Sequence, residues 1–373
     1  MGWIMIKYIW QNNSWTNFTW ESEKLVSSLS NAKKAQGYIL GQADFFELRY
    51  LGEIIAEEAY TTSAIEGENL DKDAIRSSVA KRLGLPTAGL TKETRNSDGL
   101  VELLIDAIRG HDKRLTKERI WGWQASLFPT GFSGIHKISV GEWRKGDTPM
   151  QVISGPMGKE KVHFEAPPST SVEKEMIKFL DWWNTPPDEL DGLIRAAIAH
   201  LWFVTIHPFD DGNGRIARAI TDMALAQDEK INKRLYSLSS QIIKDKKNYY
   251  DILEKTQKGQ GDITEWINWF LDMFYRSIEN SKSKIEKSLY IGKFYKFYAQ
   301  VELNERQKKV IQRLLDCLPE DFRGGLTNKN YVAMTKISPG TAKRDLADLV
   351  NKSILIPNEG KGRSVSYRLN RKI

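Results

Sequence analysis

One run of twelve residues, 207–218, brings together side chains that could do chemistry. It reads His-Pro-Phe-Asp-Asp-Gly-Asn-Gly-Arg-Ile-Ala-Arg. The run holds a histidine that can act as a base near neutral pH, a carboxylate suited to a divalent cation, a glycine-rich turn and two arginines. Arginines three positions apart share one helix face and reach the same anion. These residue types together predict a polyphosphate site with a base and a metal ligand at its rim.

Two helices are expected to position this run. Leu193–Ile206 is apolar on all sides and must end near Pro208, because proline interrupts a helix. Downstream, apolar residues recur at helical spacing, so a second helix begins near Gly214. The glycine turn therefore opens a helix N-terminus, where unpaired backbone N–H groups and the helix dipole favour an anion.

Taken singly, each of these residues is more often structural than functional, but their joint order is hard to obtain by accident. The run resembles the Fic family motif His-Pro-Phe-x-[Asp/Glu]-Gly-Asn-Gly-Arg-x-x-Arg at every fixed position. The resemblance implies that His207 is the general base toward a target hydroxyl. It also implies that Asp211 holds a Mg²⁺ on the phosphates of ATP, and that Phe209 anchors the loop in the core.

The same resemblance assigns the rest of the motif to ATP. Gly212, Asn213 and Gly214 would line the anion hole, Arg215 would bind the β-phosphate and Arg218 the γ-phosphate. The implied reaction is transfer of AMP to a Ser, Thr or Tyr hydroxyl of a protein. Family members that act as kinases have lysine at the second glycine of the motif, so Gly214 favours nucleotidyl transfer.

A second motif lies far upstream, in the run Thr-Ser-Ala-Ile-Glu-Gly at 62–67. It resembles the Fic inhibitory motif [Ser/Thr]-x-x-x-Glu-[Gly/Asn]. Thr62 and Glu66 are four apart and stack on one helical face, and Gly67 ends the helix. The resemblance implies that Glu66 pairs with Arg218 in the place of the γ-phosphate. The alternative is an ordinary glutamate at the end of a surface helix.

Two further segments resemble parts of the family's site. Gln151–Ser154 and Lys161–Phe164 predict a β-hairpin around a Gly/Pro turn. In position it matches the flap on which Fic enzymes dock a target as an added strand, through Val152, Ile153 and Ser154. A purely structural hairpin is the alternative. After the motif, two residues occupy nucleotide-contacting positions of the family, Tyr250 and Gln257, although the family more often has Asn at the second.

Composition predicts a cytoplasmic enzyme without a membrane span or a disulfide framework. The 373 residues contain one cysteine, and no run of 18 apolar residues is free of charge. Met1–Trp10 carries Lys7 and lacks a small-residue cleavage site, so we expect no signal peptide. Within this tryptophan-rich start, Tyr8–Gln11 predicts a short β-like segment. Long helices are expected from Trp20 and over Phe45–Ile65.

The basic charge belongs to the last 73 residues. They hold 15 Lys and Arg against 8 Asp and Glu, a surplus of 7 that equals the net charge of the whole chain. Their pattern of three helices and a hairpin, Ile354–Pro357 with Val365–Leu369, resembles a winged helix-turn-helix. DNA phosphates would then meet residues of the recognition helix and the wing, namely Thr341, Lys343, Arg344, Lys361 and Arg363. A protein-docking or dimerisation module is the alternative.

We therefore expect a mainly α fold: a Fic helical core with a small β-hairpin flap, and a C-terminal winged helix. The expected domains are an N-terminal helical extension with the inhibitory helix (1–85), the Fic core (86–290) and the winged helix (300–373). The expected function is a protein adenylyltransferase that uses ATP and Mg²⁺ and is autoinhibited by Glu66. The competing interpretation is a DNA-binding regulator whose core senses nucleotide or modifies only itself. The target, removal of AMP and a homodimer stay open.

Overall fold

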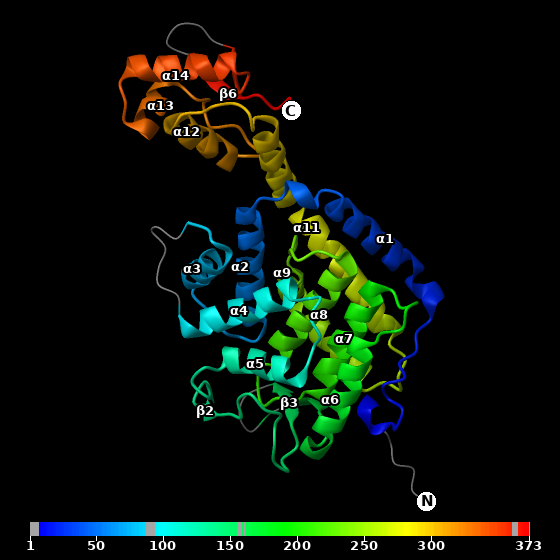
Figure 1. The fold of residues 1–373 in the computed structure, drawn as a ribbon. Helices are drawn as coiled ribbons and strands as arrows, with labels where there is room; N and C mark the ends of the chain where they lie inside the picture. Colours follow the sequence, from blue (N-terminus) through cyan, green and yellow to red (C-terminus); the bar gives the residue numbers. More distant parts are fainter. Residues whose placement is uncertain (1–6, 87–93, 155–158, 160, 360–364, 373) are drawn as a thin grey trace, which may run out of the picture. The chain divides into compact units, whose positions relative to one another are not determined.

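A computed structural model describes residues 7–86, 94–154, 159, 161–359 and 365–372. The chain is mainly helical (Figure 1) and divides into two units. The first unit comprises Met1–Ala43 and Leu48–Ser281, and the second comprises Asp44–Glu47 and Lys282–Ile373. The division falls within one continuous helix, α11 (Thr264–Phe297). No described helix combines the length and the apolar composition that a membrane crossing requires.

A pair of helices forms the centre of the first unit. These are α7 (Gly192–Ile206) and α8 (Asn213–Glu229), and the chemical motif supplies the loop between them. Every residue of α7 from Leu193 onward is buried, which explains why the sequence shows no polar face there. Asp191 caps α7 by accepting from the amide of Leu193 at 2.9 Å. Both helices begin within one residue of their predicted starts, so this prediction is confirmed.

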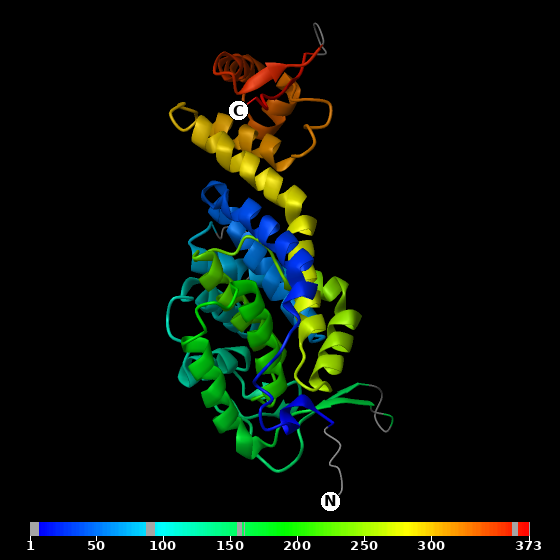
Figure 2. The same ribbon diagram turned by 90° about the vertical axis from the view of Figure 1, so that its right-hand side faces the viewer.

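Other helices pack around this pair, as the two views in Figures 1 and 2 show. Helix α2 begins at Leu48 after a 3₁₀ turn, η2 (Ala43–Phe45), slightly later than predicted. Besides α7, α8 and the first part of α11, the described helices of the first unit are α1 (Ser22–Leu40), α2 (Leu48–Ile65), α3 (Lys72–Leu83), α4 (Arg95–Arg109), α5 (Lys117–Leu127), α6 (Ser169–Asn184), α9 (Ser239–Lys244) and α10 (Lys246–Gln257).

Two antiparallel hairpins belong to the first unit. The short one pairs β1 (Phe132–Ser133) with β2 (His136–Lys137), and the longer one pairs β3 (Gln151–Ser154) with β4 (Lys161–Glu165). The longer hairpin confirms the predicted strands, and it has an irregular register after Val152. Its predicted turn, 155–158, lies outside the described residues.

The N-terminal segment packs beside this hairpin (Figure 2). The β-like prediction for Tyr8–Gln11 is wrong, because Ile9–Gln11 forms a 3₁₀ helix, η1. The Gln11 side chain accepts from the amides of Lys7 and Tyr8 and so closes a turn. The aromatic residues then pack inward: Tyr8 meets the ring of Phe164 edge-on at 5.3 Å.

The second unit has its own apolar core. It contains the end of α11, then α12 (Glu305–Asp316), α13 (Asn328–Thr335), α14 (Pro339–Asn351) and an antiparallel pair, β5 (Leu355–Pro357) with β6 (Tyr367–Leu369). Leu326 adds a bridge to Tyr367. Ser338 caps α14 with Pro339 in its first turn, as the sequence predicts. Lys361 and Arg363, expected on the wing, lie outside the described residues.

Candidate active site

The loop between α7 and α8 is fixed by its own side chains. Asn213 binds the backbone of Phe209 twice, accepting from its amide at 3.0 Å and donating to its carbonyl at 2.8 Å. Phe209 is fully buried and packs on Trp143, with ring centroids 5.0 Å apart. The side chain of Asn213 is therefore committed to the loop, and only its backbone is left for an anion.

His207 is held in one tautomer at the start of this loop. Its backbone is left-handed (φ 51°), an uncommon conformation for a residue with a side chain. Nδ1 lies 3.2 Å from the carbonyl oxygen of Val204. Because a carbonyl only accepts, Nδ1 carries the hydrogen and Nε2 keeps its lone pair. Burial lowers the pKa of His207 to about 4 against a smaller opposing effect of the Val204 carbonyl, so the imidazole is neutral at pH 7.

A buried arginine that the motif does not contain orders the same loop. Arg144 donates from Nε to the carbonyl of His207 at 2.7 Å, and its amide donates to the carbonyl of Pro208 at 2.9 Å. Its guanidinium also reaches the carbonyl of Pro167. Arg144 is 4% exposed, and burial lowers its pKa. No pattern in the sequence points to Arg144, because local spacing does not mark a residue that lies 63 positions before its partner.

Asp211 stands at the rim of the site with a partly exposed carboxylate. Its oxygens accept from the hydroxyl of Ser133 and from the amide of Gly212. Among the described residues no cluster of three or more metal-ligating side chains is found. A single carboxylate such as that of Asp211 is compatible with Mg²⁺, because in nucleotide sites this ion takes one or two carboxylates and completes its coordination shell with phosphates and water.

The N-terminus of α8 holds a carboxylate. Gly212 has a left-handed backbone (φ 92°), which turns the chain into the helix. A Cβ at Gly214 would come within 2.1 Å of Oε1 of Glu66, so glycine leaves room for that oxygen. A carboxylate of the protein therefore lies beside the helix end at which the sequence predicts an anion site.

Arg218 is buried and bound by the end of α2. Its Nη2 lies 2.6 Å from Oε1 of Glu66 and donates to the carbonyl of Thr62 at 3.0 Å, while its Nε donates to the hydroxyl of Thr62 at 2.6 Å. Burial alone would lower the pKa of Arg218, but the Glu66 carboxylate, together with Tyr249 and Tyr250, outweighs burial and the pKa is raised. The ion pair expected between Glu66 and Arg218 is present.

Arg215 also pairs with α2's end, at a residue that the sequence analysis did not mark. Its Nη1 lies 2.7 Å from Oε2 of Glu68, and its Nη2 lies 3.5 Å from Oδ1 of Asp211. The guanidinium rests over the ring of Phe128, 4.9 Å from the centroid. Arg215 is 4% exposed, and its Nε has no hydrogen-bond partner among the described residues.

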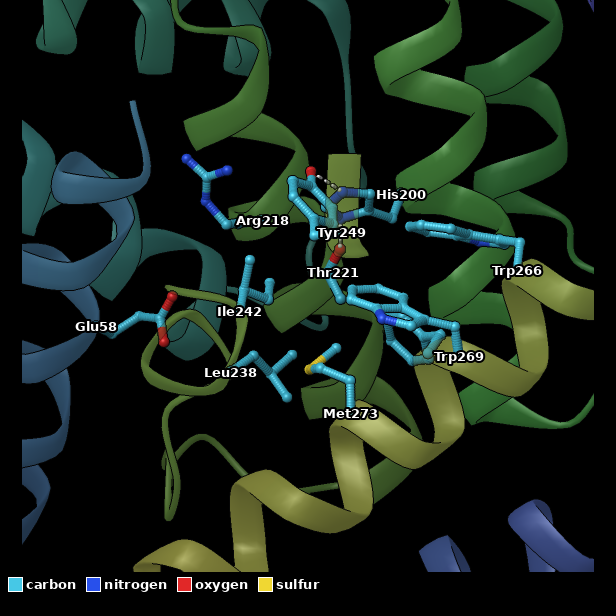
Figure 3. A pocket seen from close by; sticks show the side chains of 11 residues that line it. Glu58, His200, Arg218, Thr221, Leu238, Ile242, Tyr249, Trp266, Trp269 and Met273 are labelled. Atoms are coloured by element: carbon cyan, nitrogen blue, oxygen red, sulfur yellow. Dashed lines mark hydrogen bonds between the residues drawn. The ribbon is translucent and has the colours of Figure 1, made fainter. Parts of the chain in front are cut away.

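Arg218 also lines a small pocket, shown in Figure 3, whose lining includes a buried histidine, His200. The hydroxyl of Thr221 donates to a helix carbonyl, so His200 donates from Nδ1 to Thr221 and accepts at Nε2 from the hydroxyl of Tyr249, each at 2.9 Å. Burial lowers the pKa of His200 to about 3. The pocket is lined by Glu58, His200, Arg218, Thr221, Leu238, Ile242, Tyr249, Trp266, Trp269, Phe270 and Met273. The sequence did not point to this neutral histidine, which hydrogen-bonds to Thr221 in the middle of α8.

The two predicted nucleotide contacts both come from α10. Tyr250 is half-buried beside Tyr249, and burial raises its pKa to about 12. Gln257 is buried and donates to the hydroxyl of Thr205 on α7 at 3.3 Å. That bond is a core contact, so the side chain of Gln257 has a structural role whatever else it binds.

The hairpin β3–β4 exposes an apolar side chain on its first strand. Ile153 is 55% exposed on β3, while Val152 packs toward the N-terminal segment; Ser154 ends the strand. On β4, Nδ1 of His163 lies 2.5 Å from the Glu254 carboxylate of α10. These contacts tie the base of the hairpin to the helical core.

Comparison with known proteins matches two parts of this chain. Residues 8–85 match a domain of unknown function, DUF4172, and residues 114–225 match the Fic/DOC family. Protein adenylyltransferase Fic of Nematostella vectensis is 25% identical over 237 residues, which cover 62% of this chain and 49% of that protein. The match thus spans about half the length of this relative.

Two further proteins are similar. Uridine 5'-monophosphate transferase of Xanthomonas campestris pv. campestris (strain 8004) is 29% identical over 123 residues, covering 29% of this chain and 23% of that protein. The crystal structure of a Fic family protein from Desulfovibrio desulfuricans G20 matches with a TM-score of 0.58 at 16% identity, covering 95% of this chain and 97% of that one. Residues 114–225 therefore match the Fic/DOC family, and the chain has a fold similar to that of this Fic family protein.

Proposed function

We propose that the protein is an adenylyltransferase that moves AMP from ATP to a Ser, Thr or Tyr hydroxyl of a target protein and of itself. The observation that carries the proposal is the juxtaposition at the start of α8. Four side chains lie together at the N-terminal end of this helix: a neutral His207, the Asp211 carboxylate and the two buried arginines of the motif. Relatives that are named as adenylyl or uridylyl transferases support nucleotidyl transfer.

The residues divide the reaction between them. His207 takes the hydroxyl proton at Nε2 while the hydroxyl oxygen forms a bond to the α-phosphorus. The bond from that phosphorus to the bridging oxygen breaks, and pyrophosphate leaves. Arg215 and Arg218 bind the departing phosphates with charge-assisted hydrogen bonds. Mg²⁺ held by Asp211 would supply further neutralisation of phosphate charge.

Glu66 keeps this site closed in the resting protein. Its carboxylate lies at the N-terminus of α8 and binds Arg218, where a γ-phosphate would be bound. A triphosphate must therefore displace Glu66 or bind in another pose. Removing the carboxylate is expected to strengthen ATP binding and to switch on self-modification.

The direct test is transfer of label from α-labelled ATP to the protein itself. Glu66→Gly protein should become labelled, wild type only weakly, and Glu66→Gly/His207→Ala protein should be slower by about 10²–10⁴. UTP is run in parallel, because one relative is a UMP transferase. Activity in excess chelator would refute the role of Asp211. Label on no variant from either nucleotide would refute nucleotidyl transfer.

A second, separate activity is proposed for the C-terminal unit. Lys343 and Arg344 are exposed on α14, and Lys329 and Lys336 are exposed around α13. This basic surface suits DNA phosphates, and such binding weakens steeply with salt. Titration of labelled duplex DNA at two salt concentrations tests it. Equal affinity of wild type and the Lys343→Ala/Arg344→Ala variant would show that these two residues do not carry the binding, and absence of binding by wild type at both salt concentrations would refute the DNA-binding proposal.

A further inference from the structure

The end of α2 delivers two carboxylates to the two arginines of the motif. Glu66 binds Arg218, and Glu68 binds Arg215 at 2.7 Å. Both arginines are at least 96% buried, whereas the two carboxylates keep partial exposure, 29% for the side chain of Glu66 and 41% for that of Glu68. The fixed partners are thus the arginines, and the carboxylates are the partners that can leave.

The local backbone explains how both carboxylates reach one site. The amide of Gly67 donates to the carbonyl of Ala64 at 3.1 Å, and the amide of Glu68 donates to the carbonyl of Ser63 at 3.0 Å. Gly67 has a left-handed backbone (φ 86°), so this is a Schellman cap, with Glu66 before the glycine and Glu68 after it. One helix end therefore sets the positions of both acids.

We propose that Glu68 is a second carboxylate that occupies the site, acting at the β-phosphate position. The proposal rests on the proposed function, because that function assigns the β-phosphate to Arg215. Glu66 alone would exclude only a triphosphate. Glu68 on Arg215 additionally opposes a diphosphate, since a phosphate brought to Arg215 would meet the charges of Glu68 and Asp211 together. Glu68 thus selects nucleotides by the length of the phosphate chain.

The place of Glu68 suits a group that moves. Glu68 and Arg215 line a polar pocket together with Ser63, Thr130 and Ser133. The hydroxyl of Ser63 and Nε of Arg215 are buried there without a hydrogen-bond partner among the described residues. When Glu68 leaves, Arg215 keeps its ring contact with Phe128 and presents its free donors to a phosphate oxygen.

The test is calorimetric titration of AMP, ADP and ATP, each with Mg²⁺, into wild type, Glu68→Gln, Glu66→Gly and the double variant. Glu68→Gln should bind ADP about fivefold more tightly than wild type, with AMP unchanged. Glu66→Gly protein should bind ATP more tightly than wild type, and its affinity for ADP should stay near the wild-type value. The double variant should bind ATP more tightly than either single variant.

Controls separate this role from a structural one. Glu53→Gln removes the same charge from an exposed position near the start of α2 and should change no affinity. Glu68→Asp keeps the charge, so its affinity for ADP should stay near that of wild type. Glu68→Ala removes both the charge and the hydrogen-bond acceptor, and it should bind ADP more tightly, as Glu68→Gln does. Melting temperatures of all variants report on folding.

The outcomes also separate this proposal from the proposed function. Equal or weaker ADP binding by both Glu68→Gln and Glu68→Ala overturns the role of Glu68, even if Glu66→Gly transfers AMP. Tighter ADP binding by those variants in a protein that transfers no nucleotide supports the role of Glu68 and refutes the enzyme.

Discussion

The imidazole of His207 has one nitrogen committed to the Val204 carbonyl, so Nε2 alone is left for proton transfer. The backbone of His207 is left-handed, and Arg144 donates a hydrogen bond to its carbonyl. Both features hold the imidazole ring in the position in which Nδ1 meets Val204. Strained residues of this kind persist only where the surroundings fix them, and they gather at functional sites. The chemistry of the histidine is thus set by contacts outside its own motif.

This environment predicts how catalysis depends on pH. Because burial lowers the pKa of His207 to about 4, the neutral base persists below pH 6.5, where a free imidazole is half protonated. For Glu66→Gly protein, kcat/KM for ATP should stay level from pH 8 to pH 6 and fall only in more acid solution. Removing Glu66, whose charge raises the pKa, moves the fall further down. Half-loss of kcat/KM at pH 6.5 or above would contradict this assignment.

At single positions, the sequence marks candidate reactive groups but not the residues that bind them in the fold. The spacing of the motif is sufficient to mark His207, Asp211 and the arginines. The partner of Arg215, by contrast, lies 147 positions away, and no local pattern connects Glu68 to it. Arg144 was missed for the same reason. Long-range partners are fixed by tertiary packing, which a one-dimensional pattern does not contain.

At the scale of elements, patterns with one dominant cause are predicted well. Helix α7 is largely apolar because it is buried on every face. The β3–β4 hairpin follows from two β-type runs about a turn. Tyr8–Gln11 was misassigned because its aromatic residues suit a strand, whereas the Gln11 side chain binds two preceding amides and favours a 3₁₀ turn.

The contact between η1 and the β3–β4 hairpin predicts that η1 stabilises the hairpin. The indole N–H of Trp10 donates to the carbonyl of Glu165 at 2.7 Å, at the end of β4. Trp10→Phe keeps an aromatic side chain but loses the indole N–H and its hydrogen bond, which is worth about 0.5–1.5 kcal/mol. Amide hydrogen exchange in β3 and β4 should therefore become about two- to tenfold faster, while exchange in α7 stays unchanged. Unchanged exchange in the hairpin would mean that η1 does not hold it.

At the scale of the whole molecule, two cores lie on one chain. The C-terminal core is built only from residues of the second unit, among them Phe294 on α11, Leu314 on α12 and Leu346 on α14. Helix α11 contributes its first part to one unit and its end to the other. The site around His207 takes all of its described contacts from the first unit.

This separation predicts that damage to one core stays local. Leu314 is 3% exposed, so Leu314→Ala should destabilise the second unit by about 2–5 kcal/mol through lost burial and a cavity. Amide exchange should accelerate throughout α12–α14 and stay protected in α7 and α8. AMP transfer by Glu66→Gly protein should survive the substitution. The matched change in the first core is Leu201→Ala on the buried helix α7. It should accelerate amide exchange in α7 and α8 and leave α12–α14 protected. Equal loss of protection in both units from either substitution would show that the two cores fold as one cooperative structure.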